Sequence, residues 1–296
     1  MFKVSCPIPE EAVEAIEVML CEEVRCNWSI FNVRPHEPFF LIGYFQDRNS
    51  LEVSYAALQQ AFSFLPTTPE ISEIEDREWQ EAYKAYIEPW STRGLHWVPV
   101  WEQSTYTIPD GEHAVYLDAG MAFGTGSHET TRLMAKRLID YKHAHQETSW
   151  QTAQVIDAGC GSGILALSAS ILGFATVYAF DRDPEAIRVS QENAEANGVQ
   201  SSTIEFREAG IEAGLSGRKA DLLLANIQAD VLRIHADSFL EAMSPGSWLC
   251  LSGILGIEKD AVQTVFENKA HAINRTFKVD GRVDGEWADL CFQFNN

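Results

Sequence analysis

The sequence of 296 residues is short of basic side chains. Lys and Arg together number 22 against 43 Asp and Glu, which gives a formal net charge of −21 at pH 7. A free-standing nucleic-acid-binding protein carries a basic face, and so does a protein that docks on an anionic membrane. The deficit therefore argues against both kinds of partner, although it permits a basic protein as a partner.

Long apolar runs and closely spaced cysteines are also missing. No stretch reaches the roughly 18 apolar residues that a membrane-spanning helix needs. Residues 1–7 do not have the basic and apolar regions of a signal peptide. The six cysteines include no Cys-x-x-Cys pair. We therefore expect buried thiols in a reducing cytoplasm rather than disulfides.

The length predicts about two domains, and the N-terminal part has its own pattern. Over residues 1–66 the order β-α-β-β-α, with a last strand near Phe64, predicts a small α+β (ferredoxin-like) domain. Ser50 is the expected N-cap of its second helix. Because this part shows no evident chemistry, we expect it to be a recognition or packing module. Residues 67–95 form the expected linker, with an acidic helix over Glu70–Tyr86.

The remaining residues, 96–296, predict an α/β domain. Strands at 154–157, 176–181, 221–226 and 248–252 alternate with helices at 164–172, 184–197, 229–243 and 258–270, which indicates a parallel sheet with crossover helices. Further strands are expected upstream, at 97–101, 106–108 and 114–118, before a helix at 128–141. Two final strands, 275–279 and 288–294, have no helix between them and must pair antiparallel.

The most informative stretch is a glycine-rich turn between the strand at 154–157 and the helix at 164–172. Asp157 ends the strand, and Gly159 and Gly161 allow a backbone that approaches a ligand closely. The amides at the start of the helix then face that ligand. Ile164 stands where a dinucleotide fingerprint needs its third glycine, so a nicotinamide cofactor is disfavoured.

Two polar residues follow at the ends of the next strands. Asp181 ends the strand at 176–181, where a carboxylate can accept both hydrogen bonds of a ribose diol. Asn226 ends the apolar strand at 221–226 and brings one acceptor and two donors. Ligands of open α/β sheets bind outside the carboxyl ends of the strands. The coincidence of three strand ends favours a binding site over simple turn formation. Asp183, by contrast, is expected to cap the helix at 184–197.

The glycine turn resembles the first motif of S-adenosylmethionine-dependent methyltransferases, in which the acid at the position of Asp157 helps to organise the amino-acid end of the cofactor. A second loop makes the resemblance specific. Residues 122–131 (AFGTGSHETT) resemble the signature of the PrmA family, the lysine methyltransferases of a large-subunit ribosomal protein. Residues 156–166, 225–227 and 251–255 also match family motifs. The resemblance covers nearly the whole chain and is weakest over residues 1–70.

The resemblance implies a seven-stranded, Rossmann-like methyltransferase domain that uses S-adenosylmethionine. The family's cofactor contacts fall on Thr131, Gly159, Asp181 and Asn226. The loop that contains Phe123 and Gly124 would cover the methionine end of the cofactor. The implied reaction is N-methylation of lysine in a ribosomal protein, by a monomer that binds no metal, no nucleic acid directly and no membrane.

Asn226 is our candidate for orienting the incoming amine or the cofactor. His128 is more simply a structural hydrogen-bonding residue, whereas Asp118, Glu129 and Asp230 are candidates for attracting a cationic side chain. Glu129 stands where the family usually has proline, and the proline that commonly follows Ala-Asn-Ile is absent; both departures bear on the substrate. The alternatives are methylation of another basic protein or a small amine, a cofactor-binding module without catalysis, and, least favoured, a dinucleotide oxidoreductase.

Overall fold

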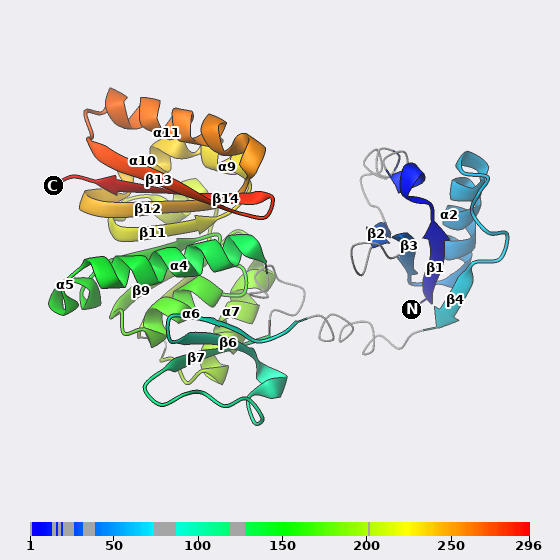
Figure 1. The fold of residues 1–296 in the computed structure, drawn as a ribbon, viewed down its shortest axis with the longest axis horizontal. Coiled ribbons are helices and arrows are strands. Elements are labelled where there is room, and N and C mark those ends of the chain that lie inside the picture. Colours follow the sequence, from blue (N-terminus) through cyan, green and yellow to red (C-terminus); the bar gives the residue numbers. More distant parts are fainter. Residues whose placement is uncertain are drawn as a thin grey trace. The chain divides into compact units, whose positions relative to one another are not determined.

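The protein is seen here as a computed structural model that describes residues 2–13, 16, 19, 27–31, 39–73, 87–118, 128–200 and 202–296. The chain divides into two compact units, Met1–Tyr86 and Ile87–Asn296 (Figure 1). Each unit has its own hydrophobic core.

The first unit contains a four-stranded antiparallel sheet in the order β2-β3-β1-β4. Its elements are β1 (Phe2–Ile8), the short 3-10 helix η1 (Glu10–Ala12), β2 (Trp28–Phe31), β3 (Phe39–Phe45), α2 (Arg48–Ala61) and β4 (Glu70–Glu73). The crossover from β3 through α2 to β4 passes over β1, which lies between the two strands. Leu51, Tyr55 and Leu58 of α2 are buried in the core of this unit because they recur at helical spacing.

Three expectations for this unit were wrong. Asp47, and not Ser50, is the N-cap of α2, since its side chain accepts a hydrogen bond from the Ser50 amide. The last strand is not near Phe64. It is β4, at the start of the segment for which a helix was expected, and it is held there by backbone pairing with β1. The rest of the expected helix, 74–86, lies outside the described residues.

The second unit is built on a seven-stranded sheet in the order β10-β9-β8-β11-β12-β14-β13. The first five strands in this order are parallel, and β14 pairs antiparallel with both β12 and β13, as the missing helix between the last two strands predicts. The strands are β8 (Gln154–Ala158), β9 (Thr176–Asp181), β10 (Ile204–Glu208), β11 (Ala220–Asn226), β12 (Met243–Leu255), β13 (Phe277–Asp284) and β14 (Trp287–Phe294).

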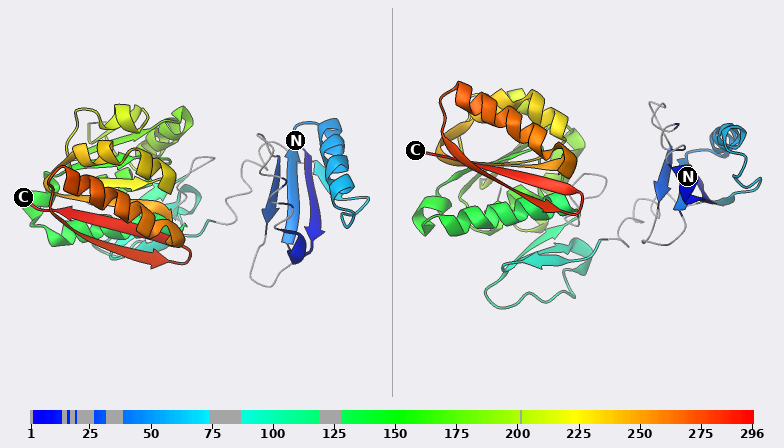
Figure 2. Two further views of the ribbon diagram at one scale, coloured as in Figure 1. Left: turned by 90° about the horizontal axis from the view of Figure 1, so that it is seen from above. Right: turned by 45° about the horizontal axis from the view of Figure 1, so that its top comes forward.

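Helices cover both faces of this sheet (Figures 1 and 2). One face carries α4 (Glu129–Ala144), α5 (Glu147–Gln151), α6 (Ile164–Ile171) and α7 (Pro184–Ala196), and the other carries α8 (Ile211–Leu215), α9 (Ala229–Ile234), α10 (Ala236–Glu241) and α11 (Lys259–Ala272). Successive strand residues serve opposite faces: Val155 packs under the first set of helices and Ile156 under the second. The expected α/β fold class is confirmed.

A smaller sheet, β5-β6-β7, packs beside α6 and α7. Its strands are β5 (Trp90–Thr92), β6 (Leu95–Pro99) and β7 (His113–Leu117), and the short 3-10 helix η3 (Val100–Glu102) follows β6. Residues 106–109 belong to no helix or strand, so the strand expected at 106–108 was wrong. Within the described ranges, no helix combines the length and the apolar character that a membrane-spanning segment requires.

Candidate functional site

The candidate site begins at the turn between β8 and α6. Gly159, Gly161 and Gly163 have φ angles of +76°, +53° and +78°, which residues with a side chain rarely adopt. The amides of Gly159 and Cys160 both donate to the carbonyl of Phe180 on β9, at 2.8 and 3.0 Å. A Cβ atom on Gly159 would lie only 2.5 Å from Cγ2 of Ile227. The turn therefore packs closely against both neighbouring strands and needs glycine at this position.

Asp157 lies beneath this turn. Its carboxylate accepts a hydrogen bond from the Ala166 amide at 3.0 Å, and only 1% of the residue is exposed. Burial raises the pKa of Asp157 to about 7, while the Ala166 hydrogen bond opposes the shift and the nearby Asp181 adds to it. In this structure Asp157 stabilises the start of α6, and its expected contact with a cofactor stays a prediction.

Asp181 stands at the end of β9, beside the glycine turn. One carboxylate oxygen accepts from the Gly161 amide and the other from the Asp183 amide, both at 3.0 Å. Asp183 in turn caps α7, because its side chain accepts from the Glu185 amide, as expected. The partly exposed carboxylate of Asp181 is thus held in one orientation by two backbone amides, at the edge where the parallel strands end.

Asn226 ends β11, two strands away from Asp181 and next to β8. Its Nδ2 donates to Oγ1 of Thr131, a fully buried residue in the first turn of α4, at 3.4 Å. Its Oδ1 is buried and has no hydrogen-bond partner among the described residues. A buried acceptor without a partner costs about 1–3 kcal/mol, so this atom is suited to a donor that arrives with a ligand.

The segment after Asn226 is fixed by β12. The Ile227 amide donates to the Ser252 carbonyl at 3.1 Å, and a Cβ atom on Gly253 would lie 2.4 Å from the Ile227 carbonyl oxygen. Ile227 is therefore held between Gly159 of the turn and Gly253 of β12. These close approaches explain why the sequence has glycine at both places.

Two supporting residues on α7, which hold neighbouring segments in place, were not identified from the sequence. Asn193 lies on α7, and Asn197, one helical turn later, is the C-cap of this helix. The side chain of Asn197 accepts from the Tyr116 amide in β7, and that of Asn193 accepts from the Asp118 amide. Asn193 also donates to the Ser162 carbonyl of the glycine turn. The signal that could have revealed them is the spacing of two asparagines by four residues on one helix face.

His128 is the N-cap of α4, as a structural hydrogen-bonding role would require. Its Nδ1 accepts from the Thr130 amide at 3.3 Å, and its ring packs edge-on against Trp287 at 4.9 Å between centroids. Asp230 is exposed and forms an ion pair with Arg233. Phe123 and Gly124 lie outside the described residues.

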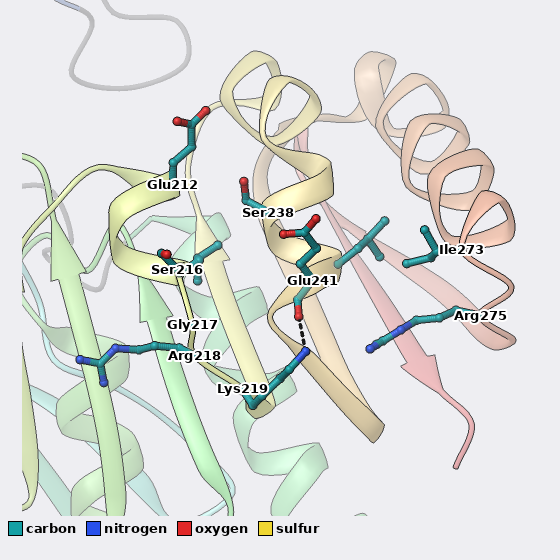
Figure 3. A pocket seen from close by; sticks show the side chains of 11 residues that line it. Glu212, Ser216, Gly217, Arg218, Lys219, Ser238, Glu241, Ile273 and Arg275 are labelled. Carbon is teal, nitrogen blue, oxygen red and sulfur yellow. Dashed lines mark hydrogen bonds between the residues drawn. The ribbon is translucent and has the colours of Figure 1, made fainter.

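A separate pocket of about 490 Å³ lies near the residues that precede β11 (Figure 3). Because β11 begins at Ala220 and ends at Asn226, this pocket is at the opposite end of the strand from Asn226. Its three basic residues are engaged in structural contacts. Lys219 donates to the Glu241 carbonyl, Arg218 pairs with Glu205 and lies over the Tyr178 ring, and Arg275 donates to the Met243 carbonyl. None of the site residues predicted from the sequence lines this pocket.

A seven-stranded sheet with one antiparallel strand near its edge, a glycine turn after β8 and polar residues at the ends of β9 and β11 are typical of Rossmann-like methyltransferases. A solved structure titled ribosomal protein L11 methylase, from Lactobacillus delbrueckii subsp. bulgaricus, has this fold. It superimposes with a TM-score of 0.59, at 27% identity, over 69% of this chain and 97% of its own.

The sequence comparisons give the family. The family model described as Ribosomal protein L11 methyltransferase (PrmA) matches residues 11–295. A protein named Ribosomal protein L11 methyltransferase from Heliobacterium modesticaldum is 33% identical over 250 residues, 82% of this chain and 74% of its own length. One of the same name from Streptococcus pyogenes serotype M12 is 35% identical over 228 residues, 76% and 67% of the two chains. The chain belongs to the ribosomal protein L11 methyltransferase family, and it is a methyltransferase.

Proposed function

We propose that this enzyme transfers methyl groups from S-adenosylmethionine to lysine side chains of ribosomal protein L11. The family and the named relatives support the ribosomal substrate. Lysine as the acceptor and S-adenosylmethionine as the donor rest on the resemblance of the motifs and on the chemistry of the site. The proposed place of action is the cytoplasm, where a ribosomal protein is available to the enzyme.

The observation that carries the proposal is the buried Oδ1 of Asn226, which has no partner among the described residues and lies beside a glycine turn that packs closely on Ile227. A side chain at Gly159 would meet Ile227, so glycine is what lets the turn pack beside the end of β11 and Asn226. The Asp181 carboxylate, two strands from Asn226, is an acceptor suited to a ribose diol. The residues present therefore fit S-adenosylmethionine: acceptors at two strand ends and backbone amides at the start of α6.

In this assignment Gly159, Gly161 and Asp181 hold the donor, and Thr131 and Asn226 lie at its methionine side, with Phe123 and Gly124 as the proposed cover. Asp157 contributes by holding the start of α6. The small N-terminal domain (residues 1–66, to which the pairing of β4 adds a strand) is proposed to recognise the substrate. Residues 67–95 are the proposed connection, and residues 96–296 carry the chemistry.

S-adenosylmethionine, when bound, supplies a methyl group on a sulfonium, and the new C–N bond forms as the C–S bond breaks. A lysine side chain has a pKa near 10.4, so it must lose a proton before it can attack. Asp157 is enclosed and cannot receive this proton, so we assign the proton to water. The contribution of the protein is then alignment and exclusion of water, with Asn226 orienting the amine or the donor.

The test is mass spectrometry of L11 from cells with and without this chain, combined with transfer of tritium from labelled donor to purified L11. We expect methylated lysines and label on L11 only when the chain is present. Label on another protein or on a small amine, and not on L11, would show that the methyl acceptor is that molecule instead of L11. Saturable donor binding by calorimetry without any transfer would favour a non-catalytic module, and absence of donor binding would overturn the proposal.

A further inference from the structure

Asn193 of α7 connects two segments that approach the candidate site from different parts of the chain. It is 3% exposed. Its Oδ1 accepts from the Asp118 amide at 2.9 Å, and its Nδ2 donates to the carbonyls of Asp118 and Ser162 at 3.1 and 3.0 Å. Both hydrogens of the amide are therefore used, one toward each segment.

The two segments have different roles in the site. Asp118 directly precedes residues 119–127, the stretch that contains Phe123 and Gly124. Ser162 belongs to the glycine turn, next to Gly161, whose amide donates to Asp181. The same face of α7 meets the turn again at Ser190, since a Cβ atom on Gly163 would lie 2.8 Å from the Ser190 Cβ. Asn193 thus fixes the point where 119–127 begins with respect to the glycine turn.

Asn197 provides a natural comparison. Its Oδ1 accepts from the Tyr116 amide at 2.7 Å, and its Nδ2 donates to the carbonyls of Tyr116 and Asn193. It therefore holds β7 by the same amide-to-backbone pairing. Among the described residues, the hydrogen bonds of Asn197 do not reach the glycine turn, whereas Asn193 bonds both to that turn and to Asp118, which follows β7.

We propose that Asn193 is a positioning residue for methyl transfer, which holds the backbone of Asp118 in place relative to the glycine turn while itself touching neither donor nor substrate. This inference rests on the proposed function. Reacting groups displaced by about 1 Å can lose a factor of about 100 in rate. A shift of one segment relative to the other therefore acts on kcat and on donor binding rather than on folding alone.

The experiment compares Asn193→Asp with Asn197→Asp in the full chain. Each change keeps the size of the side chain and replaces two donated hydrogen bonds by a carboxylate facing carbonyls. We expect N193D to lower kcat for L11 methylation about ten- to a hundredfold at saturating donor, and to raise the donor Kd. We expect N197D to keep kcat within about twofold of wild type, even where its loss of Tm is the same. Asn193→Ser, which offers a hydroxyl as the hydrogen-bond donor, should recover part of kcat. This variant is also the test to use if N193D does not fold.

Hydrogen exchange gives a readout that needs no turnover. N193D should speed amide exchange in peptides covering 159–163, whereas N197D should speed it only around β7. Equal loss of kcat in the two variants, or faster exchange in N193D that is confined to β7, would overturn the positioning role. If the wild type itself does not methylate L11, the proposed function fails, and the exchange pattern still decides on Asn193.

Discussion

The guanidinium of Arg137 and the carboxylate of Asp289 face each other through two parallel hydrogen bonds, each 2.8 Å long, inside the second unit. The side chains are 1% and 0% exposed. Burial lowers the pKa of Arg137, but the hydrogen bonds to Asp289 and Asp280 outweigh it and raise the pKa above its ordinary value. Asp289 also accepts from the Arg282 amide. The pair ties α4 to β13 and β14, so the last two strands and the helix that carries Thr131 form one body.

Removing the charge of Asp289 should therefore be costly. Asp289→Asn leaves a buried guanidinium with a weaker partner, and loss of one partner of a buried pair costs about 3–5 kcal/mol. Asp280 contacts the same Arg137 nitrogen but its side chain is 56% exposed, so Asp280→Asn should cost at most about 1 kcal/mol. Urea unfolding of the two variants measures the difference. Equal losses would show that the buried pair has no special weight.

Gly159→Ala tests the close contact of the glycine turn. The new Cβ would meet Ile227 at 2.5 Å in a backbone with φ of +76°, so the turn must move. We expect the affinity for S-adenosylmethionine to fall more than tenfold by calorimetry. Gly111→Ala is the matched control, because Gly111 has φ of +81° but no described atom within 4 Å of its Cβ position. It should carry a similar backbone strain, about 1–3 kcal/mol, with donor affinity unchanged.

A second change separates the clash from the strain in Gly159→Ala. Ile227→Ala removes the Cγ2 atom that the new Cβ would meet. The double variant should therefore bind the donor more tightly than Gly159→Ala alone. If the double variant binds no better, the backbone angle and not Ile227 makes glycine necessary.

Asn226→Ala should separate stability from function. It removes a buried acceptor that has no described partner, so the unliganded protein should unfold at the same urea concentration as wild type or a higher one. Methyl transfer should fall at least tenfold, because the orienting amide is gone. Thr131→Val is the companion variant, since it keeps the shape but loses the Oγ1 that Asn226 contacts. An Asn226→Ala enzyme with wild-type kcat and donor affinity would remove Asn226 from the site.

The raised pKa of Asp157 predicts a pH dependence of folding. An unfolded Asp has a pKa near 3.9, whereas the folded one has a pKa of about 7, so the folded state binds more protons between these values. The contribution of this group to the unfolding free energy therefore falls by up to about 4 kcal/mol as the pH rises from about 4 to 7, and it stays constant above pH 7. Asp157→Asn can keep the hydrogen bond from Ala166 without a charge. As the pH rises from 4 to 8, the unfolding free energy of Asp157→Asn should increase relative to that of the wild type. A difference that does not change with pH would contradict the raised pKa of Asp157.

The part of the fold that the sequence predicts best is the sheet around β8, β9 and β11. These strands are mostly apolar and carry Asp157, Asp181 and Asn226 at or next to their ends, and each is followed by a turn and a helix, so pattern and position agree. The glycine turn was recognisable because glycine itself signals close backbone approach. Donor binding by these residues is a prediction that calorimetry can test.

Other elements depend on contacts that a local pattern does not contain. β10 was not predicted: it is an edge strand of alternating residues in which only Ile204 and Phe206 are apolar. The helix expected over 229–243 is divided at His235 into α9 and α10, although Leu232 and Phe239 continue the apolar spacing across the break. Asn193 went unnoticed because its importance comes from Asp118 and Ser162, which are distant in the sequence.

The net charge of −21 leads to a last prediction, about substrate capture. A ribosomal protein that binds RNA is basic, so an acidic enzyme attracts it over distances that salt can screen, about 10 Å at 0.1 M ionic strength. We expect the KM for L11 to rise several-fold between 50 and 300 mM salt, while kcat stays constant because alignment within the site does not depend on the long-range field. The Kd of S-adenosylmethionine, a small ligand held by short contacts, is the internal control and should change less than twofold. A KM for L11 that does not depend on salt would show that apolar contacts, and not the acidic surface, bring the substrate to the enzyme.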